Sequence, residues 1–357
     1  MNHNEAMRRA LELAWRGWGR VYPNPMVGAV VLAGGEPVSE GYHAEFGGPH
    51  AEADALAAAG ERARGGTLVV SLEPCTHQGK QPPCTDLIVS SGLREVVLAL
   101  PDPNPEAGGG TTRLRAAGLT VETSVLLEEA ARQNAIFLHR FADPSRPYVA
   151  LKLATSLDNK IADRHGRSRW ISGEEARTFV HWLRAGFEAI GIGGHTARVD
   201  DAQLTVRGPV EPRVRPLRVV FDPQAELPES LHLVRNAKEI PTLVLASPQA
   251  SSSRIGTLER AGVQVERAGT LTAAMSLLRA RGVTSMLVEG GGRLAASLLN
   301  DGLVDRFYWI QSPLWLGEAG VPAFAGRMGR SMAEAERWPV VERRALGQDT
   351  LLVLDRR

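Results

Sequence analysis

This chain of 357 residues contains only two cysteines, Cys75 and Cys84. Both lie in one loop, in the stretch SLEPCTHQGKQPPC. A pair placed this way could form a disulfide in an oxidising compartment, or bind a metal or take part in redox chemistry inside a cell. The rest of the chain must indicate which of these applies.

Long apolar runs are also missing, since no uninterrupted stretch approaches the roughly 20 residues that a membrane-spanning helix needs. The first residues, MNHNEAMRRALELAW, carry charge throughout and have no small-residue cleavage site after an apolar segment, so they do not resemble a signal peptide. We therefore expect a cytoplasmic protein that does not enter a membrane. In a reducing compartment, a metal site is the favoured interpretation of the two cysteines.

The formal net charge is only +1, and no long basic run is present. Proteins that bind nucleic acid usually show a basic stripe, so a polynucleotide is not the expected partner. Lysine is scarce as well: the 41 basic residues include only Lys80, Lys152, Lys160 and Lys238. Because arginine serves wherever charge alone matters, a remaining lysine is a candidate for a site that needs a compact, deprotonatable ammonium.

The pattern of apolar residues predicts two α/β domains, residues 1–145 and 146–357, with the boundary in the Pro-rich stretch DPSRP at 143–147. In the first domain, strands and helices alternate as in a three-layer α/β sandwich. We expect a helix over 5–18, a hairpin over 27–41, a helix over 50–59, and strands over 67–72 and 95–100. In the second domain, we expect strands over 148–154, 189–192, 217–221, 242–246, 285–288 and 306–310, and helices over 174–184, 271–281 and 294–300.

His50, Cys75 and Cys84 together offer one imidazole and two thiolates, a ligand set that suits zinc with a fourth position open to water. Glu52 follows His50 by two residues, at the start of a predicted helix, where its carboxylate could move protons to and from that water. A closed structural zinc site would usually need a fourth protein ligand, and only His77 is near enough in the sequence to supply one. The open arrangement therefore predicts a catalytic zinc site.

The sequence His-Ala-Glu at 50–52 with Pro-Cys at 74–75 resembles the zinc-dependent cytidine-deaminase superfamily. The longer loop to Cys84, with Pro23-Asn24-Pro25, Gly41-Tyr42-His43 and Pro101-Asp102-Pro103-Asn104-Pro105, is similar to the bifunctional deaminase/reductase family of riboflavin biosynthesis. Gln81 stands where that family would have threonine. The resemblance implies hydrolytic deamination of a diaminohydroxypyrimidine that carries a phosphoribosylamino group. It also implies substrate contacts from four residues of this domain: Asn24, His43, His77 and Lys80.

The second domain contains Glu289-Gly-Gly-Gly-Arg293 between an apolar strand and a helix, where backbone N–H groups at a helix N-terminus could bind a pyrophosphate. A tight turn without a ligand would have the same sequence. Gly191-Ile-Gly193-Gly-His-Thr196, with Glu211 farther on, is only a near miss to a dinucleotide fingerprint.

Two further stretches, Lys152 to Lys160 with Ser168 to Ser172, and Thr196 to Arg207, resemble the reductase half of the same family. That resemblance implies a domain like dihydrofolate reductase with NADPH across the carboxyl ends of the strands. Ala202 replaces a usual proline, Arg198 lies in a normally apolar part of its run, and Pro223 replaces a serine that would contact the cofactor. The implied cofactor contacts are Ala154, Trp170, Thr196, Asp200, Gly291, Gly292, Arg293, Leu294, Ala295, Ala296 and Ser297. The implied substrate contacts are Ser168, Arg184, Leu204, Arg207 and Glu289, with the two arginines suited to a phosphate.

The implied reaction is hydride transfer from NADPH to the sugar of the deaminated product, which converts a ribosyl chain to a ribityl chain. Lys152 and Asp200 are the candidates for groups beside the reacting sugar, although a structural ion pair would have the same sequence. We also expect a homo-oligomer. Two alternatives stay open: a nucleobase deaminase with an accessory domain, and a chain in which one domain is only a scaffold.

Overall fold

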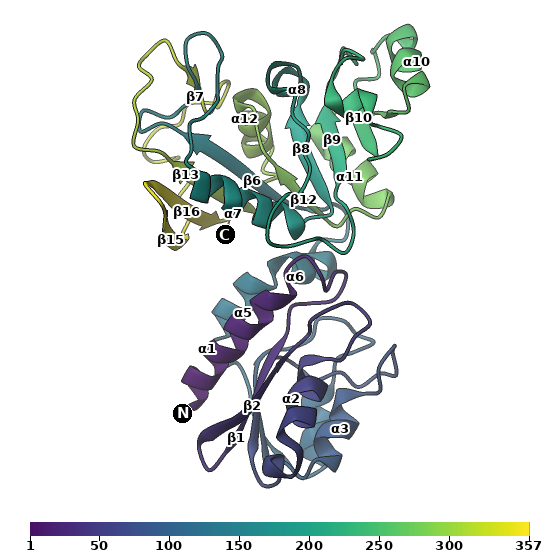
Figure 1. The fold of residues 1–357 in the computed structure, drawn as a ribbon, viewed down its shortest axis with the longest axis vertical. Helices are drawn as coiled ribbons and strands as arrows, with labels where there is room; N and C mark the ends of the chain where they lie inside the picture. The colour runs from purple at the N-terminus through teal and green to yellow at the C-terminus, as the bar shows by residue number, and fades with distance from the viewer. Residues whose placement is uncertain (357) are drawn as a thin grey trace. The chain divides into compact units, whose positions relative to one another are not determined.

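The computed structural model describes residues 1–356. The chain divides into two compact units, Met1–Asp143 and Pro144–Arg357. The division lies within the Pro-rich stretch where the sequence places the domain boundary. Each unit is an α/β fold with its own sheet and core (Figure 1). No helix within the described residues is both long and apolar enough to cross a membrane.

The first unit is built on a five-stranded sheet in the order β2-β1-β3-β4-β5. The hairpin β1–β2 runs antiparallel, β1 is antiparallel to β3, and β3, β4 and β5 are parallel. The strands are β1 (Gly28–Ala33), β2 (Glu36–Tyr42), β3 (Thr67–Leu72), β4 (Glu95–Leu100) and β5 (Thr120–Glu122). The helices are α1 (His3–Ala14), α2 (Ala51–Ala59), α3 (Cys84–Ser90), α4 (Gly110–Ala116), α5 (Leu127–Gln133) and α6 (Ala135–Ala142).

Helices cover both faces of this sheet, which gives the three layers that the sequence predicts. Helix α1 and helix α5 lie on one face, joined by a hydrogen bond from Gln133 Nε2 to the Leu11 carbonyl at 2.7 Å, and α2 and α3 lie on the other (Figure 1). Gly28 lets α1 approach β1 closely, because a Cβ at that position would stand 1.9 Å from the Ala10 carbonyl oxygen. Helix α1 ends at Ala14 and gives way to a 3-10 turn over Trp15–Gly17, so the expected helix over 5–18 is too long at its end.

The second unit contains a nine-stranded sheet in the order β11-β10-β9-β8-β12-β6-β13-β16-β15. All pairs from β11 to β13 are parallel, and β16 and β15 complete the edge in antiparallel pairs. A separate two-stranded ribbon joins β7 to β14. The strands are β6 (Tyr148–Thr155), β7 (Lys160–Ala162), β8 (Ala189–Gly193), β9 (Leu217–Phe221), β10 (Thr242–Ala246), β11 (Gln264–Arg267), β12 (Ser285–Val288), β13 (Arg306–Gln311), β14 (Val321–Pro322), β15 (Val340–Leu346) and β16 (Asp349–Asp355).

Six helices accompany the larger sheet, and its central strands are buried on both faces. Along β9, Val219 and Phe221 belong to one apolar cluster, whereas Val220 belongs to another with Ile190 and Val244. Burial on both faces explains why these parallel strands are nearly continuous apolar runs in the sequence. The helices are α7 (Glu174–Ala185), α8 (Gly194–Asp200), α9 (His232–Arg235), α10 (Ser252–Arg260), α11 (Leu271–Ala280) and α12 (Gly292–Asn300).

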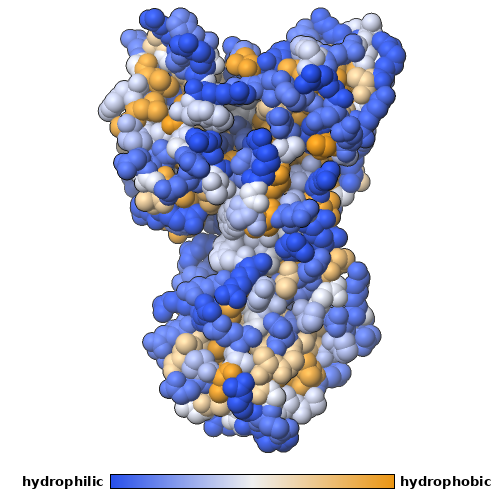
Figure 2. All heavy atoms as spheres, in the orientation of Figure 1, coloured by the Kyte–Doolittle hydropathy of each residue, from blue (hydrophilic) through white to orange (hydrophobic). Residues whose placement is uncertain are grey.

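The face of the molecule drawn in Figure 2 is mostly hydrophilic, and its apolar residues form small scattered groups. This distribution is ordinary for a surface in contact with water.

Candidate active sites

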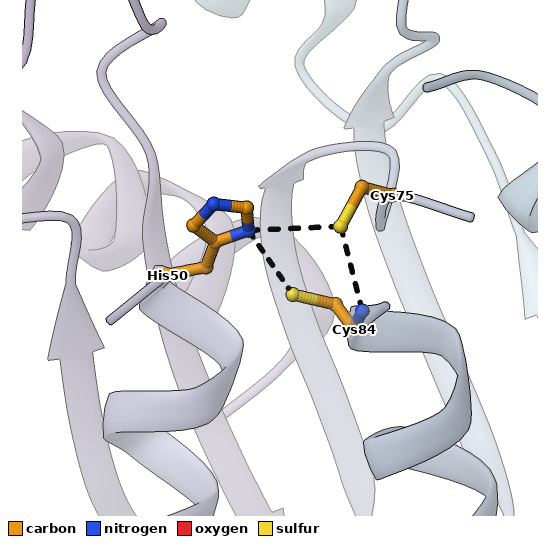
Figure 3. A group of neighbouring side chains, drawn as sticks. All are labelled: His50, Cys75 and Cys84. Atoms are coloured by element: carbon orange, nitrogen blue, oxygen red, sulfur yellow. Dashed lines mark hydrogen bonds between the residues drawn. The ribbon is translucent and has the colours of Figure 1, made fainter. Parts of the chain in front are cut away.

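The first unit gathers His50, Cys75 and Cys84 at the ends of three different elements (Figure 3). His50 is the N-cap of α2, Cys75 follows β3, and Cys84 is the first residue of α3. The distance from His50 Nδ1 is 3.3 Å to Cys84 Sγ and 3.6 Å to Cys75 Sγ. Two such ligands in a tetrahedral zinc site would stand about 3.6 Å apart, given zinc bonds of about 2.05 Å to nitrogen and 2.3 Å to sulfur. The three side chains therefore fit zinc as they stand.

Hydrogen bonding distinguishes the two thiols. The Cys84 thiol and the Cys84 backbone N–H, the latter at 3.4 Å, both donate to Cys75 Sγ and lower the pKa of Cys75 to about 4. The same contact, together with burial, raises the pKa of Cys84, so the proton of the pair stays on the Cys84 thiol. Because zinc binds thiolates, loading the site must release this proton.

Glu52 lies in the first turn of α2 with only 4% of its surface exposed. Burial raises the pKa of its carboxyl group, and the neighbouring His50 opposes this only in part. A carboxyl group with a raised pKa holds a proton more readily than an exposed one, as a group that takes up and gives back a proton requires. Glu52 therefore has the burial and placement that a proton shuttle beside the three ligands requires.

A cavity of about 290 Å³ opens beside this cluster. His43 lies in its wall, where its Nδ1 donates to the Pro49 carbonyl at 2.8 Å. The ring proton is thus on Nδ1, and Nε2 accepts from the Asn24 amide nitrogen at 3.1 Å, which fixes the orientation of that amide. Burial lowers the pKa of His43 and keeps the ring neutral.

The remaining predicted contacts of this domain, His77 and Lys80, also line the cavity from the loop between the two cysteines. The Lys80 ammonium stands 4.0 Å from the centre of the Phe46 ring, where a cation–π contact holds it. Asp102 and Asn104 lie in the same wall, although the sequence indicates them only as part of the Pro101–Pro105 motif. Their position directly after β4, a buried parallel strand, was the feature of the sequence that could have predicted their place in the cavity wall.

The second unit has a larger cavity of about 920 Å³ at the carboxyl ends of β6, β8 and β12. Ligands of open α/β sheets bind at such an edge. The cavity brings together most of the residues predicted for the reductase from five separate stretches of the chain. They are Lys152, Ala154, Ser168, Trp170, Arg184, Thr196, Asp200, Leu204, Arg207, Glu289 and Gly291.

The other predicted cofactor contacts, Gly292 to Ser297, do not line this cavity. They form the first turns of α12, and Ala295 and Ala296 are buried in the core. Gly291 stands at the cavity edge and approaches Thr196 closely, since a Cβ on Gly291 would lie 2.6 Å from Thr196 Oγ1. The cavity volume, and the absence of a side chain at Gly291, fit an extended dinucleotide.

Two residues that line the cavity, Arg184 and Glu289, form an ion pair. Arg184 donates from Nε at 2.5 Å and from a terminal nitrogen at 2.8 Å to the two carboxylate oxygens, and it also donates to the Thr205 carbonyl at 2.8 Å. Although burial alone would raise the pKa of Glu289, the cations of Arg184 and Lys152 lower it overall. Two of the five residues predicted to bind the reductase substrate, Arg184 and Glu289, thus bind each other.

Lys152 and Asp200 occupy different parts of the same cavity. Burial lowers the pKa of Lys152, Glu289 partly opposes the shift, and Arg184 adds to it. Asp200 instead accepts a hydrogen bond from Ser168 Oγ at 3.0 Å. Within the described residues no ion pair joins Lys152 to Asp200, so the carboxylate that faces the lysine is Glu289.

These two sites identify the class of protein. The chain joins a zinc domain like that of cytidine deaminases to a nicotinamide-dependent reductase domain. Family models agree: the model for the cytidine and deoxycytidylate deaminase zinc-binding region matches residues 1–100, and that for the RibD C-terminal domain matches residues 147–352. The chain belongs to the RibD family of riboflavin biosynthesis. It is a bifunctional enzyme with a zinc-binding deaminase domain and a reductase domain of the NADPH-dependent kind.

Relatives extend over nearly the whole chain. The riboflavin biosynthesis protein RibD of Aquifex aeolicus is 39% identical over 98% of this chain and 97% of its own, and that of Escherichia coli is 37% identical over 98% of both. The structure of Acinetobacter baumannii RibD is similar, with a TM-score of 0.84 at 34% identity, and covers 99% of this chain and 98% of its own. A diaminohydroxyphosphoribosylaminopyrimidine deaminase/5-amino-6-(5-phosphoribosylamino)uracil reductase from Thermotoga maritima gives a TM-score of 0.83 at 35% identity with the same coverage.

Proposed function

We propose that the first domain deaminates a diaminohydroxypyrimidine that carries a phosphoribosylamino group, and that the second reduces the ribosyl chain of the product with NADPH. One observation carries the proposal. A relative that matches over 98% of this chain, and a family model for each half, coincide with two separate cavities, each lined by the groups that its reaction needs. The alternative, a nucleobase deaminase with an accessory domain, leaves the Lys152, Glu289 and Arg184 cluster without a purpose.

In the deaminase cavity, His50, Cys75 and Cys84 would hold zinc, which when bound supplies Lewis acidity that activates a water molecule. Glu52 takes a proton from the attacking water and delivers it to the exocyclic nitrogen. A carbon–oxygen bond forms, the carbon–nitrogen bond breaks, and ammonia leaves. Asn24 and His43 orient the ring from the cavity wall, and His77 with Lys80 contacts the phosphorylated end.

In the reductase cavity, NADPH when bound supplies the hydride, and the protein provides orientation and the proton. Ala154, Trp170, Thr196, Asp200 and Gly291 would contact the cofactor. With the sugar open as an imine, the anomeric carbon receives the hydride and the nitrogen receives a proton. Lys152, with its lowered pKa and its place beside Glu289, is the candidate for the group that gives this proton.

The Cys75→Ser substitution tests the division of labour between the domains. We expect zinc content and ammonia release to be lost, because one of three ligands is gone, while reduction of deaminated substrate continues at the wild-type rate. Loss of both activities from a chain with an unchanged circular dichroism spectrum would contradict the division. Homo-oligomeric assembly and a cytoplasmic location belong to the same proposal, and light scattering and cell fractionation would measure them.

A further inference from the structure

Trp170 presents an open aromatic ring to the reductase cavity. It lines the cavity with 69% of its surface exposed. It lies between β7 and α7, where residues 163–173 form neither helix nor strand. A large side chain in such a loop loses conformational freedom when it packs against a ligand, and this loss weakens binding unless the side chain is already held in place. The neighbours of Trp170 therefore decide how well it can serve a bound molecule.

Arg177, on α7, is the neighbour that can hold the ring. Its Cζ lies 4.6 Å from the centre of the Trp170 ring. Its Nη1 donates to the Ser172 carbonyl at 2.8 Å, which fixes the guanidinium against the same loop. No carboxylate among residues 1–356 lies within ion-pair distance of Arg177, so its charge is not neutralised. A cation over the face of an indole is attracted by the ring electrons, and tryptophan gives the strongest contact of this kind.

A second arginine ties the loop on the other side of Trp170. Arg169 donates from Nη2 to the Asp200 carbonyl at 2.6 Å, which joins the loop to the end of α8. Its Cζ is 6.0 Å from the Trp170 ring, at the outer limit of a cation–π contact. Arg169 thus fixes the backbone of the loop, and Arg177 makes the closer contact with the ring itself.

We propose that Arg177 is a positioning residue for the cofactor: its cation–π contact holds the indole of Trp170 so that the open part of the ring meets NADPH. This rests on the proposed function, which takes Trp170 to contact NADPH. Arg177 acts through the ring and not on the cofactor itself. Its effect on NADPH binding must therefore disappear when the ring is absent.

Four variants separate these possibilities. Arg177→Met removes the cation and keeps an unbranched side chain, whereas Arg177→Lys keeps a cation that can lie over the ring. Trp170→Ala removes the ring, and the double variant Arg177→Met/Trp170→Ala completes a double-mutant cycle. Arg344→Met is the matched control, because Arg344 Cζ lies 4.8 Å from the Phe179 ring in the same unit and neither residue lines the cavity.

The measurement is the dissociation constant of NADPH, by calorimetry on the full zinc-loaded chain. Arg177→Met should bind NADPH about twofold to fivefold more weakly, as expected for loss of a cation–π contact at an exposed ring. Arg177→Lys should recover most of the loss. In the Trp170→Ala background, Arg177→Met should cause no further loss, and Arg344→Met should bind as the wild type does. In turnover, KM for NADPH should rise in Arg177→Met more than kcat falls.

Equal binding by Arg177→Met and the wild type would overturn the inference and leave the proposed function intact. A further loss in the Trp170→Ala background would also overturn it, because Arg177 would then act independently of the ring. Equal losses in the Met and Lys variants would show that the charge is not what acts. If Trp170→Ala bound NADPH as tightly as the wild type, the proposed cofactor contact of Trp170 would itself be wrong. An unchanged circular dichroism spectrum checks that each variant is folded.

Discussion

Removing the charge of Glu289 should destabilise the second unit more than its small change in size suggests. In Glu289→Gln the amide keeps the shape of the carboxylate, but Arg184 then stands without a counter-charge beside Lys152. The side chains of Arg184 and Glu289 are 13% and 9% exposed, so water cannot replace the lost partner well. Removing one member of a buried pair costs about 3–5 kcal/mol, and the remaining amide oxygen places this case at about 3 kcal/mol.

Urea unfolding followed by tryptophan fluorescence measures this effect, since Trp182, Trp309 and Trp338 lie in the same unit. With an m-value of about 2–3 kcal/mol/M, the midpoint should fall by roughly 1–1.5 M. Glu226→Gln is the matched control, because its partner Arg254 and Glu226 itself are 50% and 43% exposed, and an exposed pair is worth less than about 1 kcal/mol. A midpoint for Glu289→Gln no lower than that of Glu226→Gln would refute the reasoning.

Three further predictions concern the titratable groups of the two cavities. Glu52→Gln should retain zinc but lose about 10²–10⁴-fold in the rate of ammonia release, since general acid–base catalysis is worth that much; near-normal release would exclude Glu52 as the proton shuttle. Lys152→Met should abolish NADPH oxidation and raise the urea midpoint. The midpoint should rise because burial lowers the pKa of Lys152, so the folded chain holds the Lys152 proton less tightly than the unfolded chain does. A lower midpoint would contradict this. The stability that ionised Glu289 contributes should be fully present above its unfolded pKa of about 4.5 and should be lost as the pH falls through the lower folded pKa. Below about pH 4.5, the free energy of unfolding should therefore fall less steeply with pH in Glu289→Gln than in the wild type. Parallel curves would argue against the lowered pKa.

Much of the fold could be predicted because its central strands are buried. The strands over 67–72, 95–100, 217–221, 242–246 and 285–288 have the expected bounds, since burial on both faces leaves an apolar run with clear ends. The edge strand β15 and its neighbour β16 were missed. Strand β15 has charged, exposed residues at Glu342, Arg343 and Arg344, and its pairing with β16 is not visible in local composition.

The zinc ligands could be found from the sequence because each belongs to a short motif with a fixed chemical meaning. The reductase cavity was harder, because its contacts join residues far apart in the chain. Arg184 and Glu289 are separated by 105 positions, and nothing local shows that they neutralise each other.

The most direct test of two reactions in series is NADPH oxidation by the purified, zinc-loaded chain when the aminated phosphoribosyl pyrimidine is its only substrate. The account predicts ammonia release followed by oxidation of NADPH. Ammonia without oxidation would confine the activity to the first domain and leave the second as a scaffold or an enzyme for another substrate. Neither signal from folded protein would contradict the account as a whole.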